Sequence, residues 1–274
     1  MPSVCMFKIH VLGEILGKMS KGQAVMLSSI GVLLGIILFL TTGKQGWPPS
    51  ALVGNDDHSS AVVESMITAR GTVRPVSANL KDIATGITFP RQKRFASKVE
   101  LFCLGVGVRV KKIAVVNVKV YSVGLYVEAK AARGALKTFK GISPETLSGD
   151  ASLYKALGNP GFTKYLHLIF ARGVEAQKVV DALTSVKGVS EEALSSFSSL
   201  ILEAISGKIG EGESISLGWE GKDKMLVLVQ DKLVGVVKDP ALPKAVFELY
   251  LGAYPVSESA KAAFAEGVSE LLGT

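Results

Sequence analysis

The stretch from Leu104 to Glu128 restricts the fold most strongly, because it is built mostly of aliphatic residues, valine above all. Such a density of β-branched side chains favours strands over a helix. One arginine, Arg109, lies near its start, and Tyr121 follows twelve residues later. Arg109 could belong to a phosphate-binding loop, to a solvated strand edge, or to a pocket that holds its charge for an acidic ligand.

A phosphate-binding loop is the weakest of these three. The run GVGVRVKK lacks the spacing of a P-loop or of a GxGxxG loop, and a valine-rich strand follows it where both motifs need a helix. The sequence contains neither a GxSxG nor an HExxH motif. The candidate site therefore depends on Arg109 and the strands around it.

The order of the predicted elements indicates an α+β fold. Strand-like segments come first, at 86–95, 98–107, 112–128 and 162–172, with a short helix at 129–139 and Asn117 as a possible tight turn. Helices are predicted to begin after Ser143 and Ser190, which have N-cap chemistry, and over 173–186. A hairpin or meander turning at 220–223 and two last helices, one capped by Ser257, complete the chain. Because strands and helices do not alternate, we expect a large antiparallel sheet with helices on one face.

Composition points to a membrane segment or to strands buried on both faces. Apolar residues make up 48% of the chain, charged residues 20%, and the mean hydropathy is +0.36. Residues 22–43 carry no charge and would span about 30 Å as a helix, enough to cross a bilayer. Lysines are more frequent before this run than after it, which favours the N-terminus on the positive side of the membrane.

The N-terminal region could also be a secretory signal or an organelle-targeting sequence. A cleaved secretory signal would have a shorter n-region, a shorter apolar run and an A-x-A site directly after that run, where the sequence has none. An organelle-targeting sequence fits residues 1–21, which are basic and poor in acids. The sequence thus predicts a basic or targeting segment at 1–21, a transmembrane anchor at 22–43, a linker at 44–85 and one folded domain at 86–274.

Charge and metal-ligating residues exclude several other classes of function. The formal net charge is +7, but the basic residues are spread along the chain, and aromatic residues are not interleaved with them. No nucleic-acid partner is therefore expected. The two cysteines, Cys5 and Cys103, lie on opposite sides of the predicted anchor, and the three histidines are far apart. Neither a disulfide framework nor a metal site is expected, and no cofactor is predicted. His167 is predicted to be a hydrogen-bonded strand residue.

Three blocks of the sequence resemble the chalcone isomerase superfamily: LGVGVRVKKIAVVNVKVYSVGLYVE, FTKYLHLIFARGVEAQKVVDAL and LVGVVKDPALPKAVFELYLGAYPVSESAKAAFAEGVSELL. The resemblance extends over residues 86–273. It implies an open-faced β-sandwich, in which a ligand cleft lies between a large antiparallel sheet and the helices layered on it. That fold agrees with the order of elements.

The resemblance also implies which residues to inspect. In the flavonoid-forming enzymes an Arg, a Thr, a Lys, a Tyr and an Asn surround the substrate. Arg109 lies one residue before the Arg position, so a one-residue bulge or a change of the turn is needed. Ser122 stands at the Thr position beside Tyr121. Phe170 stands at the Lys position. The Tyr and Asn positions fall on Ala176 or Gln177 and on Ala182 or Leu183.

This pattern resembles the non-catalytic branch of the family, the plastid fatty-acid-binding proteins. The resemblance implies a fatty acid whose carboxylate binds Arg109 and Tyr121, with Ser122 and Phe170 nearby and the acyl chain in the cleft. An intramolecular lyase of the chalcone isomerase type and a structural domain without a ligand remain alternatives, and Arg109 could instead face solvent beside two lysines. The branch and the basic N-terminus favour a plastid membrane, and a mitochondrial membrane is the alternative.

Overall fold

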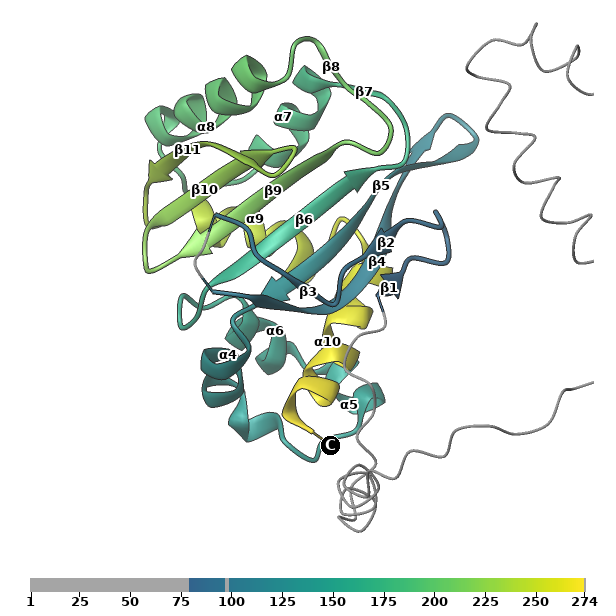
Figure 1. Cartoon of the computed structure of the whole chain (residues 1–274), viewed down its shortest axis with the longest axis vertical. Helices are drawn as coiled ribbons and strands as arrows, with labels where there is room; N and C mark the ends of the chain where they lie inside the picture. Colours follow the sequence, from purple (N-terminus) through teal and green to yellow (C-terminus); the bar gives the residue numbers. More distant parts are fainter. Residues whose placement is uncertain (1–78, 97–98, 274) are drawn as a thin grey trace, which may run out of the picture. The chain divides into compact units, whose positions relative to one another are not determined.

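The computed structural model describes residues 79–96 and 99–273 of the 274-residue chain. Its centre is a seven-stranded sheet in the order β11-β10-β9-β6-β5-β4-β3, in which every neighbouring pair is antiparallel (Figure 1). The sheet strands are β3 (Gln92–Lys93), β4 (Leu101–Ile113), β5 (Val116–Val127), β6 (Lys164–Phe170), β9 (Ser214–Glu220), β10 (Lys224–Val229) and β11 (Lys232–Lys238). Two short strand pairs lie outside it, β1 (Leu80–Lys81) with β2 (Thr88–Phe89) and β7 (Val174–Glu175) with β8 (Lys208–Ile209).

Helices cover one face and one end of this sheet, as the order of elements predicts (Figure 1). They are α4 (Ala129–Ala135), the 3-10 turn η1 (Lys137–Phe139), α5 (Pro144–Gly149), α6 (Ala151–Leu157), α7 (Ala176–Thr184), α8 (Glu191–Ala204), α9 (Leu242–Leu251) and α10 (Glu258–Leu272). Three of the predicted starts are confirmed. The hydroxyls of Ser143, Ser190 and Ser257 accept hydrogen bonds from the backbone N–H groups of Thr146, Ala193 and Ala260.

The turn between the two long strands lies before the predicted position. Asn117 is a residue of β5 that pairs with Lys112, and the hairpin turns at Ala114 and Val115. Ala114 takes the positive backbone angle of the turn, with φ of 52°. Sequence chemistry favours asparagine in that conformation, but the ladder from Arg109 to Ile113 extends past Asn117 and determines the turn instead.

The domain begins earlier than residue 86. Residues 80–95 cross the sheet face opposite the helices (Figure 1). Phe89, Tyr126 and Tyr165 belong to one buried cluster there, and Leu80 and Phe95 pack against it. Asp82 and Thr85, expected in the linker, hydrogen-bond to Ser122 on β5. His167 also lies on this face, hydrogen-bonded to Ser216 at 2.8 Å, and burial lowers its pKa to about 4. The prediction that His167 is a satisfied strand residue is confirmed.

Within residues 79–96 and 99–273, no helix is both long and apolar enough to cross a membrane. The anchor predicted at 22–43 and the targeting segment at 1–21 lie outside the described residues. The compact unit of which the described residues are part spans Thr72–Thr274. It contains the whole sheet and a buried cluster on each sheet face, so we expect a fragment of residues 72–274 to fold on its own.

Helix α10 lies directly on β4 because glycines occupy the contact. A Cβ atom added at Gly267 of α10 would overlap the carbonyl of Leu104, and one at Gly107 of β4 would overlap the backbone of Ala260. Side chains of α10 on either side of Gly267 in the sequence, among them Phe264 and Val268, are fully buried. The distance between helix and strand is therefore set by backbone atoms, which have no rotamers with which to adjust.

Lys164 is buried in the core at the start of β6. Its ammonium donates hydrogen bonds to the carbonyl oxygens of Leu157, at 2.8 Å, and Asn159, and lies 4.2 Å from the Phe162 ring centre and 4.6 Å from that of Trp219. No carboxylate pairs with it among the described residues. Burial lowers its pKa to about 7 from an ordinary value of 10.5.

The stability of the domain is therefore expected to depend on pH through Lys164. Between the two pKa values the unfolded chain binds a proton that the folded protein does not, so the free energy of unfolding rises with pH from about 7, by at most about 1.4 kcal/mol per unit. Burial raises the pKa of Cys103 to about 12, which has the opposite effect above pH 9. Urea unfolding at pH 7 and 8.5 should show the rise, and Lys164→Met should flatten it. Equal slopes in both proteins would contradict this assignment.

Candidate functional site

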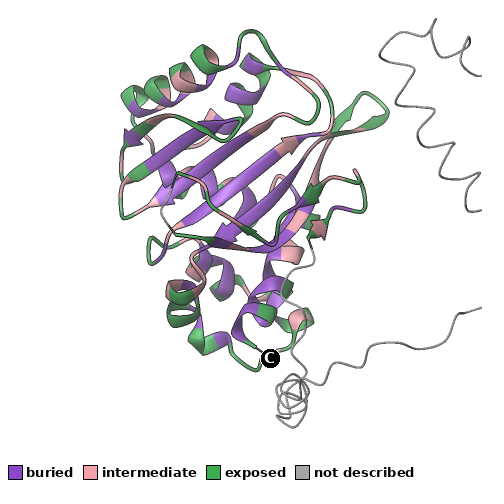
Figure 2. Ribbon diagram, viewed as in Figure 1, coloured by how far each residue is buried: buried purple, intermediate pink, exposed green. Residues whose placement is uncertain are grey.

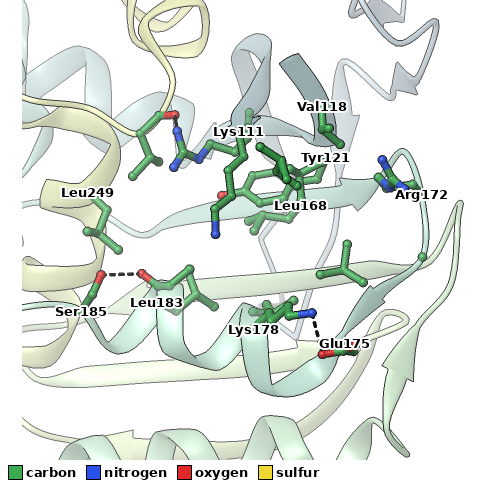
Figure 3. A pocket seen from close by; sticks show the side chains of 18 of the residues that line it. Lys111, Val118, Tyr121, Leu168, Arg172, Glu175, Lys178, Leu183, Ser185 and Leu249 are labelled. Carbon is green, nitrogen blue, oxygen red and sulfur yellow. Dashed lines mark hydrogen bonds and ion pairs between the residues drawn. The ribbon is translucent and has the colours of Figure 1, made fainter. Parts of the chain in front are cut away.

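A cavity of about 670 Å³ lies between the sheet and helices α7 and α9. Figure 3 shows Tyr121 and Leu168 of the sheet facing Leu183 of α7 and Leu249 of α9 across it. Val118, Val120, Val179 and Val256 complete an apolar wall. The size and lining are those of small-molecule binding sites, which combine apolar walls with a few placed polar groups.

Arg109 and Tyr121 meet in this cavity because they are direct partners across the β4–β5 hairpin. Immediately beyond them the register shifts, since Val110 pairs with Lys119 and leaves Val120 as an extra residue. This is a one-residue β-bulge, one of the two adjustments that the resemblance leaves open. The bulge lets Val120 and Tyr121, consecutive on β5, both line the cavity, where a regular strand would send one of them to each face.

Arg109 is half-buried and held by backbone oxygens. Its Nη1 donates to the carbonyl of Val256 at 2.6 Å and to that of Val110 at 3.2 Å. No ion pair and no hydrogen bond from Nε or Nη2 joins it to another described residue. Carbonyl contacts orient the guanidinium but do not neutralise it, so its fork remains able to pair with a carboxylate.

Two tyrosines supply hydroxyl groups beside Arg109. The hydroxyls of Tyr121 and Tyr250 are 2.8 Å apart, so one donates to the other. Burial raises the pKa of both, and Arg109 partly offsets the shift, so both are neutral at physiological pH. The tyrosine that accepts the bond keeps its own O–H free to donate, which gives the site a second donor for an anionic oxygen.

Cations surround the exposed part of the cavity. Lys111, Lys112, Arg172, Lys178 and Lys208 line it, and all five are exposed. The carboxylate that lines it, Glu175, pairs with Lys178 at 2.8 Å. We call these five residues the basic rim. The rim makes the opening attractive to anions, while the interior suits hydrocarbon.

The structure does not bring Ser122 to the cavity. Ser122 follows Tyr121 on β5 and so points to the opposite face, where its hydroxyl bonds to Asp82 and lies 2.6 Å from that of Thr85. Its proposed role in ligand binding is therefore wrong in position. Phe170 is fully buried beneath Tyr121, with ring centres 5.5 Å apart, and supports that ring without lining the cavity.

Tyr250 and the basic rim are the parts of the site that sequence analysis missed. Tyr250 lies one helical turn from Val246 and Phe247 on α9, where helical spacing alone predicts a core residue. Arg172, Lys178 and Lys208 come from three separate segments, and nothing in the sequence shows that they surround one opening. Arg109, Tyr121 and Leu183, by contrast, were named from the sequence, and all three line the cavity.

No protein-family model matches the sequence, and no curated protein sequence matches it. Among solved structures, the fold is similar to that of a fatty-acid-binding protein of Arabidopsis thaliana, with a TM-score of 0.61 and 22% sequence identity. The match covers 72% of this chain and 100% of the Arabidopsis chain. At this level of identity the likeness extends to the fold alone.

Proposed function

We propose that this protein binds a fatty acid without transforming it. The carboxylate pairs with Arg109 and accepts a hydrogen bond from Tyr121 or Tyr250, and the acyl chain occupies the apolar part of the cavity. The observation that carries the proposal is a half-buried arginine without a carboxylate partner among the described residues, facing a tyrosine inside an apolar cavity. A charge in such surroundings is costly unless an anion completes it.

Two further observations support a binding protein over an intramolecular lyase. Ala182 and Leu183 line the cavity. By the resemblance to the chalcone isomerase superfamily, the flavonoid-forming enzymes have a polar side chain at this position. Such apolar side chains suit a hydrocarbon chain, whereas unpaired polar groups beside it would be penalised. The Arabidopsis protein of similar fold is itself named a fatty-acid-binding protein.

The test of carboxylate recognition compares a free fatty acid with its methyl ester. The ester keeps the chain but removes the charge, and we expect it to bind at least about thirtyfold more weakly, because charge-assisted hydrogen bonds are each worth about 1.5–3 kcal/mol. Titration of delipidated protein with each ligand measures the two affinities. Native mass spectrometry of the protein as purified identifies any ligand that co-purifies. Equal affinities for the acid and the ester would contradict the proposed carboxylate pairing. Turnover of a chalcone would favour the lyase alternative.

We also propose that residues 22–43 anchor the protein in an organelle membrane, the plastid being favoured over the mitochondrion. The support is the uncharged run and the basic, acid-poor segment before it. Fractionation of cells followed by alkaline carbonate extraction tests both parts. Release of the protein into the soluble fraction would contradict the anchor.

A further inference from the structure

The tip of the β4–β5 hairpin exposes four consecutive apolar residues. Ile113, Val115 and Val116 are 56%, 91% and 58% exposed, and Ala114 between them is exposed as well. The hairpin projects beyond the sheet, and its tip is coloured as exposed in Figure 2. Single exposed aliphatic residues are ordinary, but a run of four exposed ones with no packing partner among the described residues indicates a contact made with something else.

The charges around this tip are all of one sign. From Arg109 to Lys119 the hairpin carries Arg109, Lys111, Lys112 and Lys119 and no acidic residue. Lys111 and Lys112 immediately precede the apolar run and also belong to the basic rim of the cavity. An apolar tip with lysines at its base is the arrangement that inserts into the headgroup region of a bilayer, where the lysines contact anionic lipid.

The tip and the cavity open on the same part of the molecule. Ile113 belongs to the tip and lines the cavity, and Lys178 and Arg172 extend the basic rim away from the hairpin (Figure 3). An acidic protein partner would satisfy the lysines but not the exposed valines. Another β-hairpin would cover the valines but not the five cations of the rim. A lipid surface with anionic headgroups satisfies both.

We infer that residues 113–116 and the basic rim dock the domain onto an anionic lipid bilayer, with the cavity opening against the membrane. The docking rests on the exposed surface alone. The proposed fatty-acid function gives the docking a purpose. An acyl chain could pass between bilayer and cavity without entering water, where exposure of its hydrocarbon is unfavourable.

The first test places a polarity-sensitive fluorophore at the tip of the full chain. Cys5→Ser removes one background thiol, and the other, Cys103, is fully buried. Labelled Val115→Cys is compared with labelled Leu233→Cys, a matched control because Leu233 is 49% exposed on β11 at the opposite edge of the sheet (Figure 1). In vesicles containing phosphatidylglycerol we expect a blue shift and quenching by brominated lipid chains at 115 only. The same response at both positions, or none at 115, overturns the docking.

The second test uses the fragment of residues 72–274, which lacks the predicted anchor. Flotation with phosphatidylglycerol vesicles should recover it, and phosphatidylcholine vesicles should recover much less. Val115→Asp is expected to lower the partition coefficient about tenfold or more, and Leu233→Asp less than about twofold. Because Val115 does not line the cavity, its variant should bind dissolved fatty acid normally. If Val115→Asp floats as well as the wild type, the docking is overturned. If the wild-type fragment floats but binds no fatty acid, only the proposed function is contradicted.

Discussion

Arg109→Ala is expected to lower the affinity for a fatty acid by at least about thirtyfold. Removing one partner of a desolvated, hydrogen-bonded charge pair costs about 2–5 kcal/mol, and each 1.4 kcal/mol is tenfold in affinity. The variant should fold normally, because Arg109 is half-buried and its Nη1 contacts are to the backbone carbonyl oxygens of Val110 and Val256. Isothermal titration with the same fatty acid, wild type beside variant, measures the loss.

Two other variants distinguish the role of Arg109 from general positive charge. Arg109→Lys keeps the charge without the fork and should recover part of the affinity. Arg172→Ala removes an exposed cation of the basic rim and should change the affinity only a few-fold, since screened surface charges contribute little. If Arg172→Ala and Arg109→Ala lose equal affinity, the carboxylate is not held at Arg109.

Gly267→Ala is expected to destabilise the domain by about 2 kcal/mol or more. By helix propensity alone, the change in α10 should stabilise by about 1 kcal/mol. The added methyl would, however, overlap the backbone of Leu104, and overpacking at a contact that cannot relax costs about 1–3 kcal/mol or more. The overlap should win because it forces α10 away from β4 and opens the core beneath it. Chemical denaturation of residues 72–274 measures the difference.

Gly134→Ala is the matched control, because a Cβ atom added there in α4 meets nothing within 4 Å. It should stabilise by up to about 1 kcal/mol through propensity alone. The two substitutions are chemically identical and are predicted to have opposite signs. If Gly267→Ala stabilises the domain, α10 and β4 can move apart without a loss of stability, which contradicts the prediction.

Local chemistry in the sequence predicted the helix starts well. The serines at 143, 190 and 257 each accept the backbone bond that an N-cap provides, which depends only on neighbouring residues. The predicted meander is also present, with its first turn between β9 and β10. These features need no information about the rest of the fold.

Features that depend on pairing between distant segments were predicted less well. The turn at Ala114 is set by the β4–β5 ladder, and residues 80–85 join the domain through contacts with the far face of the sheet. Ser122 was placed by alignment to a neighbouring position, but a shift of one residue along a strand reverses the face. Arg109 and Tyr121 were named together from the resemblance, and the structure pairs them directly across the hairpin, beside a bulge.

The extra residue at Val120 divides β5 into two segments. Odd-numbered side chains face the helix side in one segment, and even-numbered side chains do so in the other. On the core side of it, odd-numbered residues of β5 such as Val123 face the helices, and on the tip side even-numbered residues such as Val118 line the cavity. A substitution in either segment leaves this pattern unchanged. Deleting Val120 would join the phases and turn Val118 out to the opposite face, so a change of one residue in length is more damaging here than most changes of side chain.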